Sequence, residues 1–230
     1  MKTIYTLLFF FLVTINIHAQ SGVVKYESRN VNIEHFKMEF RLLFNKNKSL
    51  AISDAKPFVG KRINNRQISS KGQYNAFYMD TQTKEGLVYK KRYGKKKKMY
   101  KTVSPITAKK WTIHQEFKTI AGYKVQKATL SYDYAVRSYQ QKYESLNRGS
   151  ITVWFAPSIP VNAGPQVSGN SNHDYVLWGL PGLILEFRFE GSNYITQAIE
   201  VTLSKEEIPL DIPNKENAIE FSNEKFWNKF

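Results

Sequence analysis

Cysteine is absent from the 230 residues of this sequence. The chain therefore has no disulfide bridge, no thiol nucleophile and no thiolate metal ligand. Long apolar runs are missing after residue 20, since no later stretch approaches the roughly 20 apolar residues of a membrane-spanning helix. We expect a protein that is not transmembrane, with a core large enough to need no covalent cross-link.

Signatures of catalytic and metal sites are equally scarce. After residue 20, the histidines His35, His114 and His173 show no pairing at i, i+2 or i, i+4, so a zinc or copper site is an alternative only if it is assembled in space. His173 lies beside Asp174 and near Ser171, but no Gly-x-Ser-x-Gly elbow is present, and neighbours in sequence seldom form a triad. We expect no catalytic residue, no metal and no cofactor.

Two carboxylates, Glu186 and Glu190, raise the question of a glycosidase. Four residues apart on one strand, they would have Cα atoms about 13 Å apart. That separation exceeds the usual distance between the carboxylates of either glycosidase class. A surface face is favoured, and the leading hypothesis is a protein that is not an enzyme.

Acidic residues are few beside basic ones, and the formal charge is +15. Such a charge attracts anionic surfaces. The most concentrated basic run is Lys95, Lys96, Lys97 and Lys98, flanked by Tyr93 and Tyr100. This run has two interpretations. It is either a binding site for phosphates and sulfates, or a solvated hairpin tip whose charges prevent aggregation.

The first 20 residues have the pattern of a secretory signal peptide. Lys2 supplies the charged start, an apolar run follows to Ile17, and Ala19-Gln20 offers a cleavage point. We therefore predict a signal peptide at residues 1–20, a single β-rich domain at 21–230, and a periplasmic or extracellular location. Envelope lipid and acidic polysaccharide are then expected as partners before nucleic acid.

Alternation of apolar and polar residues, the period of a β-strand, recurs along the chain. Segments with this pattern occur near residues 24–28, 36–44, 50–52, 74–79, 87–93, 111–117, 123–129, 151–155, 183–189 and 195–203. Helical patterns are few. The sequence predicts an antiparallel curved sheet of nine or ten strands, as a half-barrel, barrel or sandwich with few short helices.

Three stretches lack a clear pattern. Residues 54–71 are polar and basic and predict a long surface loop. Residues 132–147 fit either a strand extension or a short helix, and residues 162–174 form a polar stretch that is long for a loop in a compact domain.

A rigid turn precedes the strand at 183–189. Pro181 fixes its own φ, while Gly179 and Gly182 can take positive φ values closed to other residues. No Lys-Ser/Thr pair and no helical pattern follow, which argues against a phosphate loop. The aromatic residues Trp154, Tyr175 and Trp178 lie around such glycine-proline turns and serve either as a platform for a ligand or as core supports.

The turn also carries a resemblance. Residues Gly179, Leu180, Pro181, Gly182, Leu183 and Ile184 spell the hexapeptide after which the GLPGLI family of exported Gram-negative proteins is named. The chain resembles this family over about residues 111–189, through blocks in the same order at Trp111, 120–124, 126–129, 154–157, 159–160 and 164–165.

The resemblance implies an exported protein of no established activity, associated with outer-membrane transport or surface proteins. It also implies a relation to the bowl-shaped β domain that precedes a bacterial glycoamidase. Val125 stands where family members often have cysteine, so a thiol role is absent here. We expect a non-enzymatic envelope protein that binds an anionic or amphiphilic ligand or an outer-membrane protein; the alternative is a glycan-binding module or glycan-acting enzyme.

Overall fold

A computed structural model describes residues 21–55, 58–63, 66–70, 73–92, 99–101, 103–105, 110–136, 145–162, 164–168, 174–176, 179–210 and 218–220. This part of the chain consists of strands, turns and connecting segments, with no helix. The predicted signal peptide at 1–20 lies outside it and stays a prediction.

The strands in chain order are β1 (Ser21–Asn30), β2 (Ile33–Asn45), β3 (Lys48–Ala55), β4 (Phe58–Ile63), β5 (Arg66–Ser70), β6 (Gln73–Asp80), β7 (Glu85–Arg92), β8 (Met99–Lys101), β9 (Val103–Pro105), β10 (Thr112–Ile120), β11 (Tyr123–Val136), β12 (Ser145–Ala156), β13 (Gln166–Ser168), β14 (Asp174–Val176), β15 (Leu183–Phe189), β16 (Tyr194–Ser204) and β17 (Ala218–Glu220).

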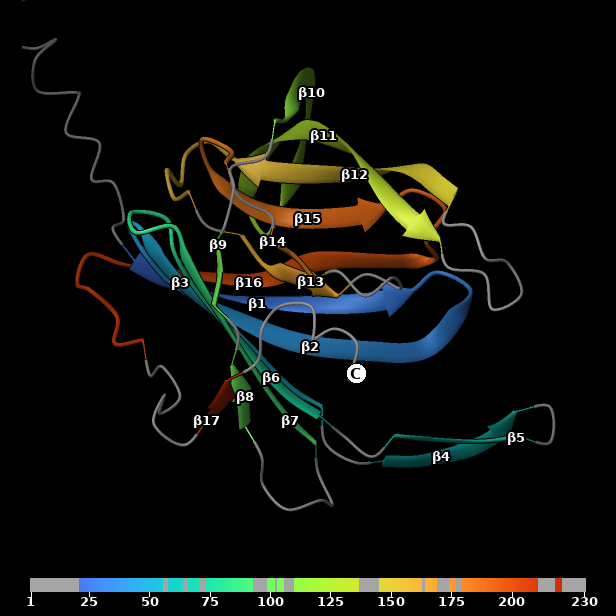
Figure 1. Ribbon diagram of the computed structural model, residues 1–230. Helices are drawn as coiled ribbons and strands as arrows, with labels where there is room; N and C mark the ends of the chain where they lie inside the picture. Colours follow the sequence, from blue (N-terminus) through green and yellow to red (C-terminus); the bar gives the residue numbers. More distant parts are fainter. Residues whose placement is uncertain are drawn as a thin grey trace, which may run out of the picture.

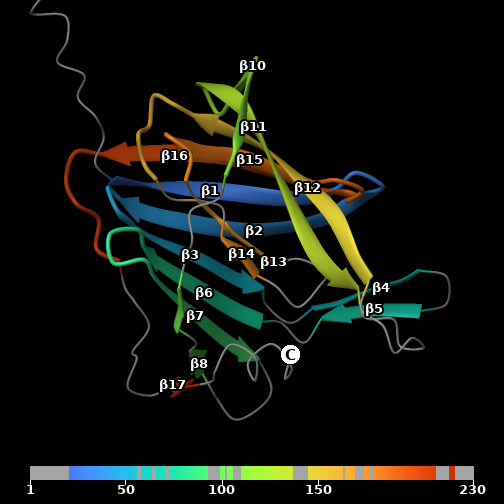
Figure 2. The same cartoon turned by 45° about the horizontal axis from the view of Figure 1, so that its top comes forward.

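One large curved sheet dominates the molecule (Figure 1). Its order is β10-β11-β12-β15-β16-β1-β2-β3-β6-β7-β8-β17, with β9 paired to β7. The pairs are antiparallel except for β17 with β8. Figure 2 shows the strands from β16 through β1, β2, β3 and β6 to β7 following one another around the curve. The predicted curved antiparallel fold is confirmed.

The first described strand lies in the middle of this sheet. β1 pairs with β16 on one side, from Ser21↔Ser204 to Asn30↔Tyr194, and with β2 on the other. Its side chains alternate between buried and more exposed positions, as the sequence pattern predicts. Strands that are far apart in the sequence therefore pair in the middle of the sheet.

The buried side chains fall into three clusters. The largest includes Val24, Leu42, Phe44, Phe77 and Met79 from β1, β2 and β6. A second joins β11, β12 and β15, and a third lies on β3, β6 and β7. Side chains on both faces of the sheet are buried, because alternating residues of β3 and β6 belong to the first and third clusters.

The turn before β15 is rigid for two different reasons. Gly179 has a φ of 97°, the positive value that the sequence predicts. Gly182 instead lies so close to β12 that an added Cβ atom would stand 2.3 Å from the carbonyl oxygen of Ala156. Between them Leu180 is buried in the second cluster, whereas Pro181 is exposed. The turn is thus pressed against β12, and its two glycines serve different purposes.

A side-chain hydrogen bond is present where the pairing between β15 and β16 ends. The two strands are in register only at Glu186↔Gln197 and Phe187↔Thr196. Closer to the turn, the buried hydroxyl of Tyr26 on β1 donates to the carbonyl oxygen of Ile184 at 2.5 Å. β1 has a register shift next to this tyrosine, between Lys25 and Tyr26. Tyr26 thus supplies a donor that the neighbouring strand does not.

The structure differs from the sequence interpretation in the connecting segments. Most of the predicted loop at 54–71 is a separate hairpin, β4 with β5, which lies apart from the main sheet (Figures 1 and 2). Short strands β13 and β14 pair within and next to the predicted loop at 162–174. The described strands therefore outnumber the predicted nine or ten. In the stretch 132–147, β11 continues to Val136 and β12 begins at Ser145.

Candidate functional site

The hairpin of β10 and β11 positions the side chains that form the candidate site. Its two-residue turn has positive φ at both positions, 48° at Ala121 and 83° at Gly122. This conformation matches the twist of the flanking strands. Beyond it, residues of β10 approach β16 to within 8 Å between Cα atoms, although three strands separate the two in the sheet order. The sheet therefore curls so that β10 lies over the face of β12 and β15.

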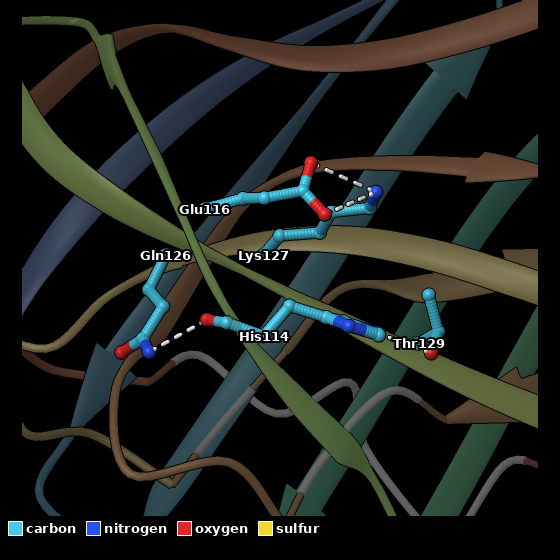
Figure 3. Close-up of polar contacts among 5 residues, drawn as sticks. All are labelled: His114, Glu116, Gln126, Lys127 and Thr129. Carbon is cyan, nitrogen blue, oxygen red and sulfur yellow. Dashed lines mark hydrogen bonds and ion pairs between the residues drawn. The ribbon is translucent and has the colours of Figure 1, made fainter.

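β10 contains a large bulge in its middle. Ile113 pairs with Ala128 and Phe117 with Gln126, so three residues of β10 stand opposite one residue of β11. The Nε2 atom of Gln126 donates to the carbonyl oxygen of His114 at 2.8 Å (Figure 3). A bulge of this kind re-aims side chains that a regular ladder would place elsewhere.

Two polar contacts extend from the bulge to β11. The Nε2 atom of the His114 ring lies 2.8 Å from the hydroxyl oxygen of Thr129. The carboxylate of Glu116 receives both hydrogen bonds of Lys127 Nζ, at 2.9 and 3.0 Å (Figure 3). Of these residues His114, Lys127 and Thr129 are half-buried, and Glu116 is exposed.

A second set of contacts on the same face connects β10 with β12 and β15. Lys118 Nζ is 2.7 and 2.8 Å from the two carboxylate oxygens of Glu186 on β15. The same Nζ stands 4.4 Å from the ring centroid of Trp154 on β12. Cross-strand register pairs Lys127 with Trp154 and Trp154 with Glu186, which places all three on one face. We call His114, Glu116, Lys118, Lys127, Thr129, Trp154 and Glu186 the β10 cluster.

Charges in the β10 cluster are matched. Lys118 is paired with Glu186, and Lys127 with Glu116. The side chains of the first pair are 35% and 14% exposed, and those of the second 26% and 55%. Each pair contributes about 0–1 kcal/mol, because water screens such contacts and ordering long side chains costs entropy. The cluster therefore combines hydrogen-bonded polar groups with an indole on one face, without a large net charge.

Sequence patterns indicate some of these residues and not others. Trp154 is at the centre of the cluster, whereas Tyr175 is placed only as a backbone position in β14. Trp178 and the lysines Lys95, Lys96, Lys97 and Lys98 lie outside the described residues, so the structure does not test them. Lys118 and Lys127 were missed, since alternation alone assigns them to a solvated face.

Glu186 and Glu190, the two carboxylates considered as a possible glycosidase pair, bind separate partners. Glu186 is bonded to Lys118, and a carboxylate oxygen of Glu190 accepts a hydrogen bond from the Ser150 hydroxyl at 2.7 Å. Within the described ranges, no three His, Asp or Glu residues come close enough to hold a metal ion. No described helix is long and apolar enough to span a membrane.

A depression outside the β10 cluster has a volume of about 380 Å³. It is open to solvent, and its lining comprises Asn45, Lys48, Tyr78 and residues 207–210. The Asn45 side chain donates to Glu207 and to the carbonyl of Ile208 and accepts from the N–H of Ile208. These bonds hold the segment after β16 against the sheet, which is a structural role.

Comparisons with known proteins place the β10 cluster within a recognised region. A family model described as "Protein of unknown function (Porph_ging)" matches residues 111–186, which contain the whole cluster. No curated protein matches the sequence.

Two solved structures are similar in fold. A structure of PNGF-II in space group C2 superposes with a TM-score of 0.58 at 19% identity, covering 91% of this chain and 32% of that one. A structure of PNGF-II in space group P21 gives 0.57 at 18% identity, covering 91% and 33%. This chain thus spans about a third of the length of the structures that it matches.

Proposed function

We propose that this protein is a non-catalytic module of the cell envelope that binds sugar chains through the β10 cluster. The observation that carries the proposal is the position of Trp154, an indole that contacts Lys118 and has Lys127 and Glu186 as its partners in the strand register. Aromatic rings stack on the apolar faces of sugars, and neighbouring polar groups bond to their hydroxyls. Lys127, which stands opposite Trp154 in the register, and its partner Glu116 supply such groups, and the His114–Thr129 contact supplies others on the same hairpin.

The matched charges favour an uncharged sugar over an anionic one. Both lysines of the β10 cluster already have carboxylate partners, so an anion would have to compete with Glu116 or Glu186. A neutral sugar needs no unpaired cation, because its hydroxyl groups can accept from a lysine and donate to a carboxylate. The ligand that fits this face is a neutral oligosaccharide.

The comparisons support a binding module without identifying its ligand. The matched family region contains the complete cluster, and the fold occurs in structures three times as long as the matched part. The resemblance to the GLPGLI family supports export, and its relation to a domain ahead of a glycoamidase supports sugar as the ligand class. Export and envelope location remain part of the proposal.

A second candidate is an anionic or amphiphilic envelope ligand, or an outer-membrane protein that carries one. The formal charge of +15 favours it, and the lysine run at 95–98 is the expected contact. Binding to anionic liposomes that weakens steeply between low salt and 1 M salt would support this candidate. Binding to neutral oligosaccharides would not require such a salt dependence.

The proposal is tested with an array of neutral oligosaccharides, followed by calorimetric titration. We expect Trp154→Ala to abolish binding and Trp154→Phe to retain part of it, since phenylalanine keeps an aromatic face. Phe117→Ala is the matched control, because Phe117 is 46% exposed on β10 and points away from its neighbour Lys118. Equal binding by the Trp154→Ala variant, with an unchanged melting temperature, would refute the proposal.

A further inference from the structure

The ring of Trp154 already has two kinds of neighbour in the free protein. Lys118 Nζ stands 4.4 Å from the ring centroid, within the range of a cation–π contact. The ring also packs against the first core cluster, which includes Ala156 and Leu183. A ligand that stacks on Trp154 would therefore have to use the side that Lys118 covers.

A sugar and Lys118 cannot share this side of the ring. Stacking brings sugar carbons to about 3.5–4.0 Å from ring carbons, which is the space now filled by the end of the lysine side chain. We propose that Lys118 is a side-chain lid that blocks the ring and must swing away when a sugar binds. This inference rests on the proposed function and adds how that site is regulated.

Glu186 is the anchor of the lid. Both of its carboxylate oxygens accept from Lys118 Nζ, at 2.7 and 2.8 Å. Its side chain is only 14% exposed and stands opposite Trp154 in the strand register, whereas the lysine is 35% exposed. The carboxylate is thus held in place while the lysine has solvent beside it, so the lysine is the group that moves.

Two consequences separate a lid from a direct ligand contact. Removing the cation while keeping the side-chain length should raise sugar affinity, because Glu186 no longer holds the side chain over the ring. The gain expected from losing one cation–π contact is about 3- to 10-fold. Salt should also raise the affinity of the native protein for a neutral sugar, because it screens the Lys118–Glu186 pair.

The lid can first be tested without any ligand. The variants are Lys118→Met and, as the matched control on the same face, Lys127→Met, whose lysine pairs with Glu116. Acrylamide quenching of Trp154 is isolated by subtracting a Trp154→Phe counterpart of each protein, and thermal melts confirm that each variant folds. We expect a higher quenching constant for Trp154 in Lys118→Met and no change in Lys127→Met. Equal quenching in the native protein and Lys118→Met would overturn the lid.

The second test titrates the same proteins with neutral hexasaccharides of glucose and of N-acetylglucosamine, at 0.05 and 1 M NaCl. Tighter binding by Lys118→Met, with no gain in Lys127→Met and no salt response left in Lys118→Met, supports the lid. If Trp154→Ala loses binding but Lys118→Met binds no more tightly than the native protein, the lid is wrong and the proposed function survives. If none of the proteins binds either hexasaccharide, both proposals are overturned.

Discussion

Gly182 is the residue at which close packing leaves least room for change. A Cβ atom there would lie 2.3 Å from the carbonyl oxygen of Ala156 and 3.0 Å from the Cα atom of Pro157, and backbone atoms cannot rotate away. We therefore predict that Gly182→Ala lowers the free energy of unfolding by about 3 kcal/mol or more, the upper range for overpacking. Urea denaturation followed by circular dichroism measures this loss.

Gly191→Ala is the control for this prediction. Gly191 has a φ of 71°, and nothing lies within 4 Å of its added Cβ atom. Alanine there should cost only about 1–2 kcal/mol, the strain of a left-handed backbone. Equal losses in the two variants would show that the contact of Gly182 with β12 costs no more than the strain at Gly191, and the steric explanation for Gly182 would be wrong.

The two glycines of this turn also show what a sequence reveals at the residue scale. A Gly-x-Pro-Gly segment predicts a rigid turn, and Gly179 has the positive φ that the pattern suggests. The reason for Gly182 was not predictable, because it depends on the carbonyl of Ala156, which is distant in sequence. Local conformation is encoded locally, whereas steric exclusion requires the tertiary contact.

At the scale of elements, a side chain of β1 bonds to β15, although β16 lies between the two strands in the sheet order. The buried Tyr26 hydroxyl donates to Ile184, and its ring stacks on Phe40 with centroids 4.8 Å apart. Tyr26→Phe keeps the stacking but leaves a carbonyl without this donor. We predict a loss of about 1–3 kcal/mol in the free energy of unfolding. An unchanged urea midpoint would mean that another donor reaches Ile184.

The same variant should alter the response to alkaline pH. Burial raises the pKa of the Tyr26 hydroxyl far above its ordinary value. The unfolded chain releases this proton near pH 10 while the folded chain keeps it, so above pH 10 the native protein loses about 1.4 kcal/mol of stability per pH unit from this group. In Tyr26→Phe the loss from this group is absent, and the gap between the two proteins should narrow from pH 9 to pH 11.

The elements of the candidate site were only partly predictable. Alternation from Trp111 to Lys118 correctly indicates a strand, and the Ala121-Gly122 turn marks the hairpin. The bulge in β10 leaves no such signal, because its residues continue the alternation. As a result, the contact of Lys118 with Trp154 and Glu186 could not be inferred. It arises from the curl of the sheet, which is a property of several strands together.

At the scale of the whole molecule, the composition and strand pattern were sufficient to predict a curved antiparallel sheet. The strand order was not predictable, since hairpins follow from sequence proximity but the pairing of β1 with β16 does not. That pairing joins the first and last long strands in the middle of the sheet. The fold therefore depends on long-range contacts that form only when most of the chain is present.

The β4–β5 hairpin is the part of the molecule that the main sheet does not need. It pairs only within itself among the described strands, whereas the last residue of β3, Ala55, stands directly opposite the first residue of β6, Gln73. A two-residue Asn-Gly turn in place of residues 56–72 would therefore connect β3 and β6 as an ordinary hairpin. We predict that the shortened protein folds with a single cooperative transition and a free energy of unfolding within about 1 kcal/mol of the native value, because a shorter connection costs less entropy.

Removing β1 is the contrasting deletion and should abolish folding, since it leaves β2 and β16 without their common partner. Circular dichroism and urea titration distinguish the outcomes, and loss of the cooperative transition on excision of 56–72 would show that the hairpin supports the sheet.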